Sequence, residues 1–354
     1  MSRIIRPVVS PRGRVVVLSG ATLWLVAAML LSAAPDGASA TEVIAPAALF
    51  TSFEEIGGAP GLLFYPRVFT DARGAIYVTD EGAARVIRLA GAAGPGAEAD
   101  VIFGREGQGP GEMLRPHSVA VDSSGNVFVT DIQLGRINKY AADGAFLTSV
   151  VLPRVGSVVI DAQDRVLAYP GRGEALLQRF SNDLGSDEPL LAKTDLLLHD
   201  STLGVLMALD AEGRLYLLDQ SGPRIDVYDR EMRRIGGWEV DAPGLRATIA
   251  QRLAAAKAKA ADGTARISGI QAMALSPDGD ELLFAYLIKP SPEEKFTRVA
   301  VYSVDGEYRW SQDRDTRVYG AAFTAGGDLL EGDPETVRVW TYGGPQPTTT
   351  SSSH

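Results

Sequence analysis

The chain of 354 residues contains no cysteine, only three histidines and few aromatic residues. Without cysteine it can form no disulfide bond, and a lipid anchor on an N-terminal cysteine is excluded, so stability must come from packing. Basic residues are also too few to balance the acidic ones, with 34 lysines and arginines against 44 aspartates and glutamates. The resulting net charge of −10 makes nucleic acid and anionic membranes poor partners.

The first forty residues differ from the rest of the chain. Four arginines precede an apolar run over residues 15–31, and a stretch of small residues then ends in Ala38-Ser39-Ala40. This order is typical of a secretory signal peptide over residues 1–40, cleaved after Ala40, and it predicts a periplasmic or secreted protein. An uncleaved membrane anchor is the alternative, although the run is short for a span of about 20 residues. Removal of the signal leaves 30 basic and 43 acidic side chains, a net charge of −13.

A strand–turn–strand pattern recurs along the chain. In residues 66–89 a short strand ends at Asp71, a turn closes on Gly74, and an alternating strand follows; residues 116–140 repeat this order. Six copies can be aligned, with the equivalent positions Asp71, Asp122, Asp161, Asp210, Ser276 and Thr324. The spacing suits blades of about 40–50 residues. It predicts an all-β fold, a six-bladed β-propeller of four-stranded antiparallel blades.

The two ends of the repeat region predict how the ring closes. The last copy stops after its third strand, and a lone strand at 49–57 precedes the first copy, so we expect this strand to complete the final blade within residues 41–343. Residues 244–262 hold good helix formers between Pro-Gly and Asp-Gly, which predicts one helical insertion between blades 4 and 5. It would act either as a lid or as a cover for apolar surface. The polar tail at 344–354 is expected to be disordered.

The segment GREGQGPGEMLRPHSVAVDSSGNVFVTDIQLGRINKYAADGAFL, residues 104–147, resembles an NHL repeat of the TolB-like six-bladed propeller superfamily. The resemblance covers nearly all of residues 49–343 and is weakest in the third and fifth copies. Proteins of this kind are mostly binding scaffolds, and a minority are enzymes. The resemblance therefore implies an exported bacterial member with a binding function.

Four copies contain an aspartate, four intervening residues and an arginine around the loop between the second and third strands. We expect each pair to form a structural ion pair across the hairpin, with a ring of ligand contacts as the alternative. The pairs are Asp80/Arg85, Asp131/Arg136, Asp219/Arg224 and Asp333/Arg338. The third and fifth copies have Tyr169 and Tyr286 instead, and we expect these tyrosines to be exposed at the rim, where they bind a ligand or pack on the loop.

The long connections all emerge on one face of the predicted propeller. They are residues 104–115, 186–203, 241–268 and 287–297. Because binding sites are commonly built on loops of a rigid scaffold, the ligand site is predicted on this face, over the channel mouth. The candidate ligand-binding residues are Arg67, Arg115, His117, Tyr169, His199, Gln271, Tyr286 and Tyr319. A structural, hydrogen-bonded role is the alternative for His117.

We expect a monomeric scaffold that binds a peptide, protein or glycan partner, rather than an enzyme. The alternative is a metal-dependent propeller enzyme, lactonase- or lyase-like, acting at the central channel. No catalytic residue, metal site or cofactor is predicted. Six-bladed relatives include calcium-dependent lactonases, whose channel metal is held by acidic and asparagine side chains. The residues that enter the first strand of each copy include neither kind of side chain. A lyase-like zinc site needs several channel histidines, whereas residues 41–354 contain only His117, His199 and His354.

The glycine-rich run at 104–111 is followed by neither Lys-Ser/Thr nor a helix, as a phosphate-binding loop would be. We therefore expect it to be a linker between blades.

Overall fold

The structure, a computed structural model, describes residues 47–48, 65–89, 99–171, 174–185, 187–192, 205–219, 224–240, 245, 247–248, 250–251, 270–288, 296–333 and 337–340. All of them belong to one compact unit, Ile44–His354. The predicted signal peptide at 1–40 and the tail at 344–354 lie outside the described residues. None of the described segments forms a helix long and apolar enough to cross a membrane.

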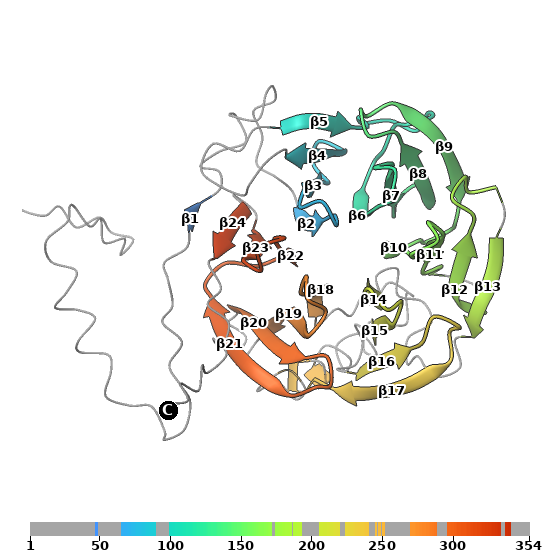
Figure 1. Ribbon diagram of the computed structural model, residues 1–354. Helices are drawn as coiled ribbons and strands as arrows, with labels where there is room; N and C mark the ends of the chain where they lie inside the picture. Colours follow the sequence, from blue (N-terminus) through green and yellow to red (C-terminus); the bar gives the residue numbers. More distant parts are fainter. Residues whose placement is uncertain are drawn as a thin grey trace, which may run out of the picture. The chain divides into compact units, whose positions relative to one another are not determined.

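The strands form antiparallel four-stranded sheets arranged as a ring (Figure 1). Five sheets consist of consecutive strands: β2 (Arg67–Thr70), β3 (Ile76–Asp80), β4 (Arg85–Leu89) and β5 (Ala99–Phe103); β6 (Pro116–Val121), β7 (Val127–Asp131), β8 (Arg136–Tyr140) and β9 (Phe146–Val151); β10 (Val158–Ile160), β11 (Val166–Ala168), β12 (Ala175–Phe180) and β13 (Asp187–Ala192); β14 (Val205–Leu209), β15 (Leu215–Asp219), β16 (Arg224–Tyr228) and β17 (Arg234–Glu239); β18 (Ile270–Leu275), β19 (Glu281–Ile288), β20 (Phe296–Ser303) and β21 (Tyr308–Arg314).

A further sheet joins the two ends of the chain. It contains β22 (Gly320–Phe323), β23 (Leu329–Gly332) and β24 (Val337–Trp340), and its outer strand is the two-residue β1 (Ala47–Ala48). Ala47 pairs with Val339 and Ala48 with Arg338. This composite sheet differs from the five complete blades, because its outermost strand comes from the start of the propeller segment and is very short.

The predicted architecture, six blades closed by residues 49–57 with one helical insertion, is therefore wrong as stated. Five blades are complete, and the closing contact is made by β1, while residues 49–57 lie outside the described part. The elements with stated bounds are all strands; within 244–262 only 245, 247–248 and 250–251 are described, and these residues have helical backbone but form no continuous described helix. A hydrophobic pattern indicates that a strand exists, but the pairing partner and register depend on where the ring brings the chain.

The predicted strand–turn–strand repeat is confirmed at its turns. Oδ1 of Asp71 accepts hydrogen bonds from the backbone N–H groups of Arg73 and Ala75, each 2.9 Å long. Asp122 makes the corresponding bonds in the next blade, and the hydroxyls of Ser276 and Thr324 do so in later ones. The turn then needs a left-handed residue, which Gly74 supplies with φ of 83°. One local hydrogen-bonding device thus closes the first hairpin of each of these sheets.

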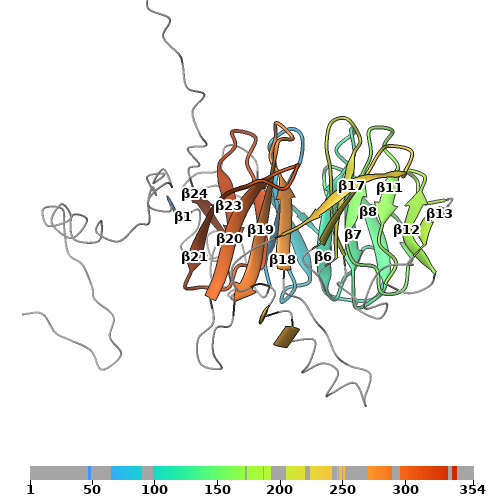
Figure 2. The same ribbon diagram turned by 90° about the horizontal axis from the view of Figure 1, so that it is seen from below.

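The core lies between neighbouring sheets. The second strands β3 and β7 are buried along their whole length, whereas the outer strand β9 alternates between half-buried and exposed side chains. Between the first two blades, the rings of Tyr77 and Tyr140 pack on Phe103, with centroids 6.2 and 6.0 Å away. Seen edge-on, the strands run along the ring axis (Figure 2). The innermost strand of each sheet therefore lines a central channel.

Candidate functional site

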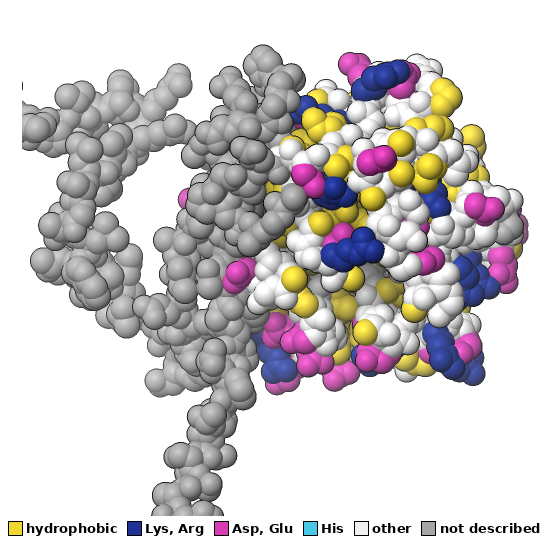
Figure 3. Space-filling model, turned by 45° about the horizontal axis from the view of Figure 1, so that its top comes forward, with side chains coloured by type: hydrophobic (Ala, Val, Ile, Leu, Met, Phe, Trp, Pro, Cys, Tyr) yellow, Lys and Arg dark blue, Asp and Glu magenta, His cyan; other side chains and the backbone are white. Residues whose placement is uncertain are grey.

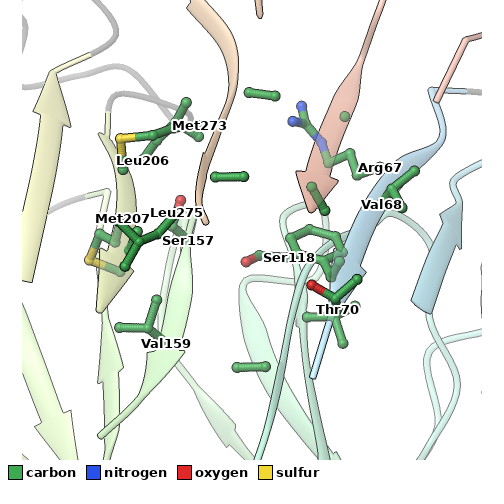
Figure 4. Close-up of a pocket in the computed structure, with 18 of the residues that line it drawn as sticks. Arg67, Val68, Thr70, Ser118, Ser157, Val159, Leu206, Met207, Met273 and Leu275 are labelled. Atoms are coloured by element: carbon green, nitrogen blue, oxygen red, sulfur yellow. The ribbon is translucent and has the colours of Figure 1, made fainter. Parts of the chain in front are cut away.

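The inner strands β2, β6, β10, β14, β18 and β22 surround a cavity of about 390 Å³ in the middle of the ring. All six run in the same direction, so their first residues meet at one end of the cavity. Figure 4 shows the guanidinium of Arg67 pointing from β2 into this space, with Met207 and Met273 on the far wall. The strand starts place charged groups at one end of the cavity, and the rest of the lining mixes the hydroxyls of Thr70, Ser118 and Ser157 with apolar side chains.

Arg67 reaches across the ring to two other sheets. Its Nη1 donates to the carbonyl oxygen of Gln271 at 3.2 Å and to that of Tyr319 at 3.3 Å. This approach is possible because residue 320 is glycine, where a Cβ would lie 2.5 Å from the Cα of Arg67. The Nε of Arg67 is buried and has no hydrogen-bond partner among the described residues. Arg67 therefore joins three sheets and keeps a buried donor, Nε, without an acceptor among the described residues.

Two further arginines lie next to Arg67. Arg115, directly before β6, forms a 2.8 Å ion pair with Glu81, and Arg317 donates to Oε1 of Gln271 at 3.1 Å. The guanidinium of Arg317 also lies 4.8 Å from the ring centre of Tyr319, a cation–π distance. Burial lowers the pKa of Arg67 to about 10; Glu81 opposes this effect, and Arg115 and Arg317 add to it. Arg115 and Arg317 thus act electrostatically on Arg67.

His117 is the buried histidine of this site. Its side chain on β6 lines the cavity, is 3% exposed, and neither ring nitrogen has a partner of hydrogen-bonding geometry among the described residues. Burial holds the pKa of His117 well below its ordinary value, helped by the charges of Arg67 and Arg115 and opposed by the backbone of Gly156. The imidazole is therefore neutral at neutral pH. We call Arg67, Arg115, His117 and Arg317, with Glu81, the cationic channel end.

The two predicted rim tyrosines are not at the rim. Tyr169 and Tyr286 are both 0% exposed, so the prediction that they are displayed to solvent is wrong. Tyr169 packs with Leu177 and Val205, and Tyr286 packs in the cluster between the fourth and fifth blades. Their large apolar rings fill the space between sheets, which a sequence comparison of blades does not reveal. The remaining candidate, His199, lies outside the described residues.

The predicted ion pairs have mixed outcomes. Asp80 and Arg85 do pair, at 3.3 Å, as predicted. Asp131 and Arg136 instead bind the linker at 104–115: Asp131 accepts from the N–H of Leu114 at 2.6 Å, and Arg136 donates to the carbonyl of Gly109 at 2.8 Å. The linker's backbone groups need partners, and these two charges provide them. Asp219/Arg224 and Asp333/Arg338 include side chains outside the described part and stay predictions.

Glu81 and Arg317 are parts of the site that sequence reasoning missed. Both lie next to positions that were recognised, since Glu81 follows Asp80 and Arg317 precedes Tyr319 by two residues. Glu81 stands at a position where the other copies carry no charge, and Arg317 has the same place before Tyr319 as Arg115 has before His117; these were the available signals. Arg67, Arg115, His117, Gln271 and Tyr319, in contrast, were predicted to share one channel end, and the structure brings them together there.

The fold defines the protein as a β-propeller with four-stranded antiparallel blades. In the described part, no cluster of three or more acidic or histidine side chains is arranged to hold a metal ion. No protein-family model and no curated protein matches the sequence.

Solved structures support the propeller fold. A member of the DUF4221 family from Bacteroides vulgatus matches 84% of this chain and 96% of its own, with 10% identity and a TM-score of 0.59. A Bacteroides fragilis protein assigned as exported matches over 84% and 93%, with 9% identity and a TM-score of 0.55. A catalytically inactive virginiamycin B lyase from Staphylococcus aureus, with quinupristin, matches over 80% and 83%, with 11% identity and a TM-score of 0.50. At these identities the likeness concerns the fold alone. The NHL type suggested by the sequence is not established by these matches.

Proposed function

We propose that this protein is an exported binding scaffold that captures a peptide, protein or glycan partner by a group inserted into the cationic channel end. The observation that carries the proposal is the pair of buried donors, His117 and Nε of Arg67, that face one cavity and have no partner among the described residues. Buried polar groups are nearly always hydrogen-bonded in folded proteins. A bound ligand would supply the missing acceptor.

The state of His117 favours binding over acid–base catalysis. A general base works best with a pKa near the working pH, and its imidazole is normally oriented by a third group. Here burial and neighbouring cations lower the pKa of His117 well below that range. A neutral imidazole between arginines is suited to donate one hydrogen bond to a ligand. The N-terminal sequence pattern supports export.

The test is binding of the fluorescently labelled full chain to arrays of defined peptides and glycans. We expect wild type to bind a limited subset of them. His117→Ala should lose that subset, while Arg230→Ala, which alters an exposed arginine on a turn, should keep it. Circular dichroism and thermal unfolding establish that both variants are folded. Absence of binding by wild type, or unchanged binding by folded His117→Ala, would contradict the proposed function.

A further inference from the structure

Among the described residues, positive charges outnumber negative ones at the cationic channel end. Three arginines meet there, and Glu81 is the carboxylate whose charge acts on Arg67. That carboxylate already accepts two hydrogen bonds from Arg115, 2.8 and 3.1 Å long. The site therefore carries excess positive charge in a chain whose net charge is −10. Like charges held together in a partly desolvated place repel one another, and a bound anion relieves that repulsion.

The hydrogen bonds of Arg67 leave its charge uncompensated. Its described acceptors are two neutral carbonyl oxygens, those of Gln271 and Tyr319. A guanidinium is the preferred protein group for oxyanions, because its planar donors match two oxygens of a carboxylate or phosphate. Among the described residues, Nε of Arg67 and the ring nitrogens of His117 are buried atoms of this site without a hydrogen-bond partner.

The rest of the channel has a different character. Across the cavity from Arg67 the wall carries the apolar side chains of Leu206, Met207, Met273 and Leu275, while Thr70, Ser118 and Ser157 add hydroxyl groups to the lining (Figure 4). Methionine adapts its shape easily and lines surfaces that accept apolar groups of varied form. On the face in Figure 3, by contrast, acidic and basic side chains of the described residues are interspersed. Inside the channel, a charged group and apolar side chains therefore line the same space.

Resting on the proposed function, we infer that the ligand group is an organic oxyanion on an apolar body. Its oxyanion binds Arg67 and His117, and its apolar part extends along the channel past Met207 and Met273. Two sources share this chemistry, namely a free organic acid and the C-terminal carboxylate of a peptide with apolar last residues. The cavity of about 390 Å³ lies in the range of small-ligand pockets, roughly 300–1,000 Å³.

Isothermal titration of the full chain with matched probes tests this inference. Octanoate and octanamide share an apolar body and differ in charge, and acetyl-Leu-Leu is compared with its amide to represent the peptide source. We expect at least one acid to bind, and to bind at least tenfold more tightly than its amide. Arg67→Gln should weaken acid binding about 10- to 100-fold, as expected for loss of a charged hydrogen-bonding partner. Arg230→Gln should leave it unchanged.

Which acid binds identifies the source of the carboxylate. Acid and amide of equal affinity, no binding of either acid, or a folded Arg67→Gln protein that binds as wild type would each overturn the inference. Arg67→Lys, which keeps the charge but not the planar donors, should bind between wild type and Arg67→Gln. If the arrays show His117-dependent binding of neutral ligands while both acids fail here, the proposed function stands and the anion inference falls.

Discussion

The Oε2 atom of Glu81 accepts hydrogen bonds from both Nη2 and Nε of Arg115, linking the turn after β3 to the residue before β6. The Glu81 side chain is nearly buried, while that of Arg115 is 30% exposed. This contact joins two blades at the channel end and also partly offsets the positive charge there. Glu81 is thus both a structural link and a regulator of the local potential.

Glu81→Gln should tighten binding of the anionic probe that binds wild type. The amide keeps a hydrogen-bond acceptor for Arg115 but removes the negative charge that opposes an anion near Arg67. We expect a gain of roughly three- to tenfold at low salt, shrinking as salt screens the interaction. Calorimetry at two salt concentrations measures it, with Glu188→Gln on outer strand β13 as the control. Weaker or unchanged binding at low salt would contradict the assigned electrostatics.

His117 should make the protein less stable in acid. Its folded-state pKa is lowered, so as pH falls below about 6.5 the unfolded chain takes up a proton that the folded chain does not. Over the window from the unfolded pKa down to the folded one, this costs up to about 1.4 kcal/mol per pH unit. His117→Gln should therefore flatten the fall of the unfolding free energy in that window. Urea unfolding at several pH values measures the slope, and identical slopes would refute the prediction.

The Arg314–Glu331 pair should be important for joining two sheets. Nε and Nη2 of Arg314 each donate to a carboxylate oxygen of Glu331 at 2.8 Å, from β21 to β23, and both side chains are at most 5% exposed. Glu331→Ala leaves a buried charge and should lower the unfolding free energy by about 3–5 kcal/mol. The double variant Arg314→Met/Glu331→Leu should lose less. Thermal and urea unfolding of wild type and the two variants decide this, and a double variant as unstable as the single one would contradict it.

Asp122 should contribute more to stability than a typical surface aspartate. Its Oδ1 accepts from the N–H groups of Ser124 and Asn126, and its Oδ2 accepts from the side-chain amides of Asn126 and Asn182. Asp122→Ala should cost about 1–3 kcal/mol, because several polar groups lose their acceptor. Asp143→Ala, in an exposed turn with a single described acceptor contact, is the matched control and should cost less. Urea unfolding compares the two losses, and equal losses would argue against this role.

The site was only partly predictable from the sequence. Repetition identified the start of each inner strand, and so placed Arg67, His117 and Gln271 at one end of a channel. The same reasoning placed Tyr169 and Tyr286 at the rim, because a departure from a repeat does not reveal whether the side chain turns outward or into the space between sheets. Likewise, Asp131 and Arg136 match the spacing of Asp80 and Arg85, yet the neighbouring linker takes their hydrogen bonds.

The sequence by itself determined the all-β repeat, since the alternation of its strands and the Asp–Gly turns are local properties with local hydrogen bonds. The tertiary structure decided how the ring closes, with Ala47–Ala48 paired to β24. It also decided that Glu81 and Arg317 surround Arg67, although they lie far apart in the chain. Charge and burial at the channel end depend on the distances among separate blades, and those distances exist only once the ring has formed.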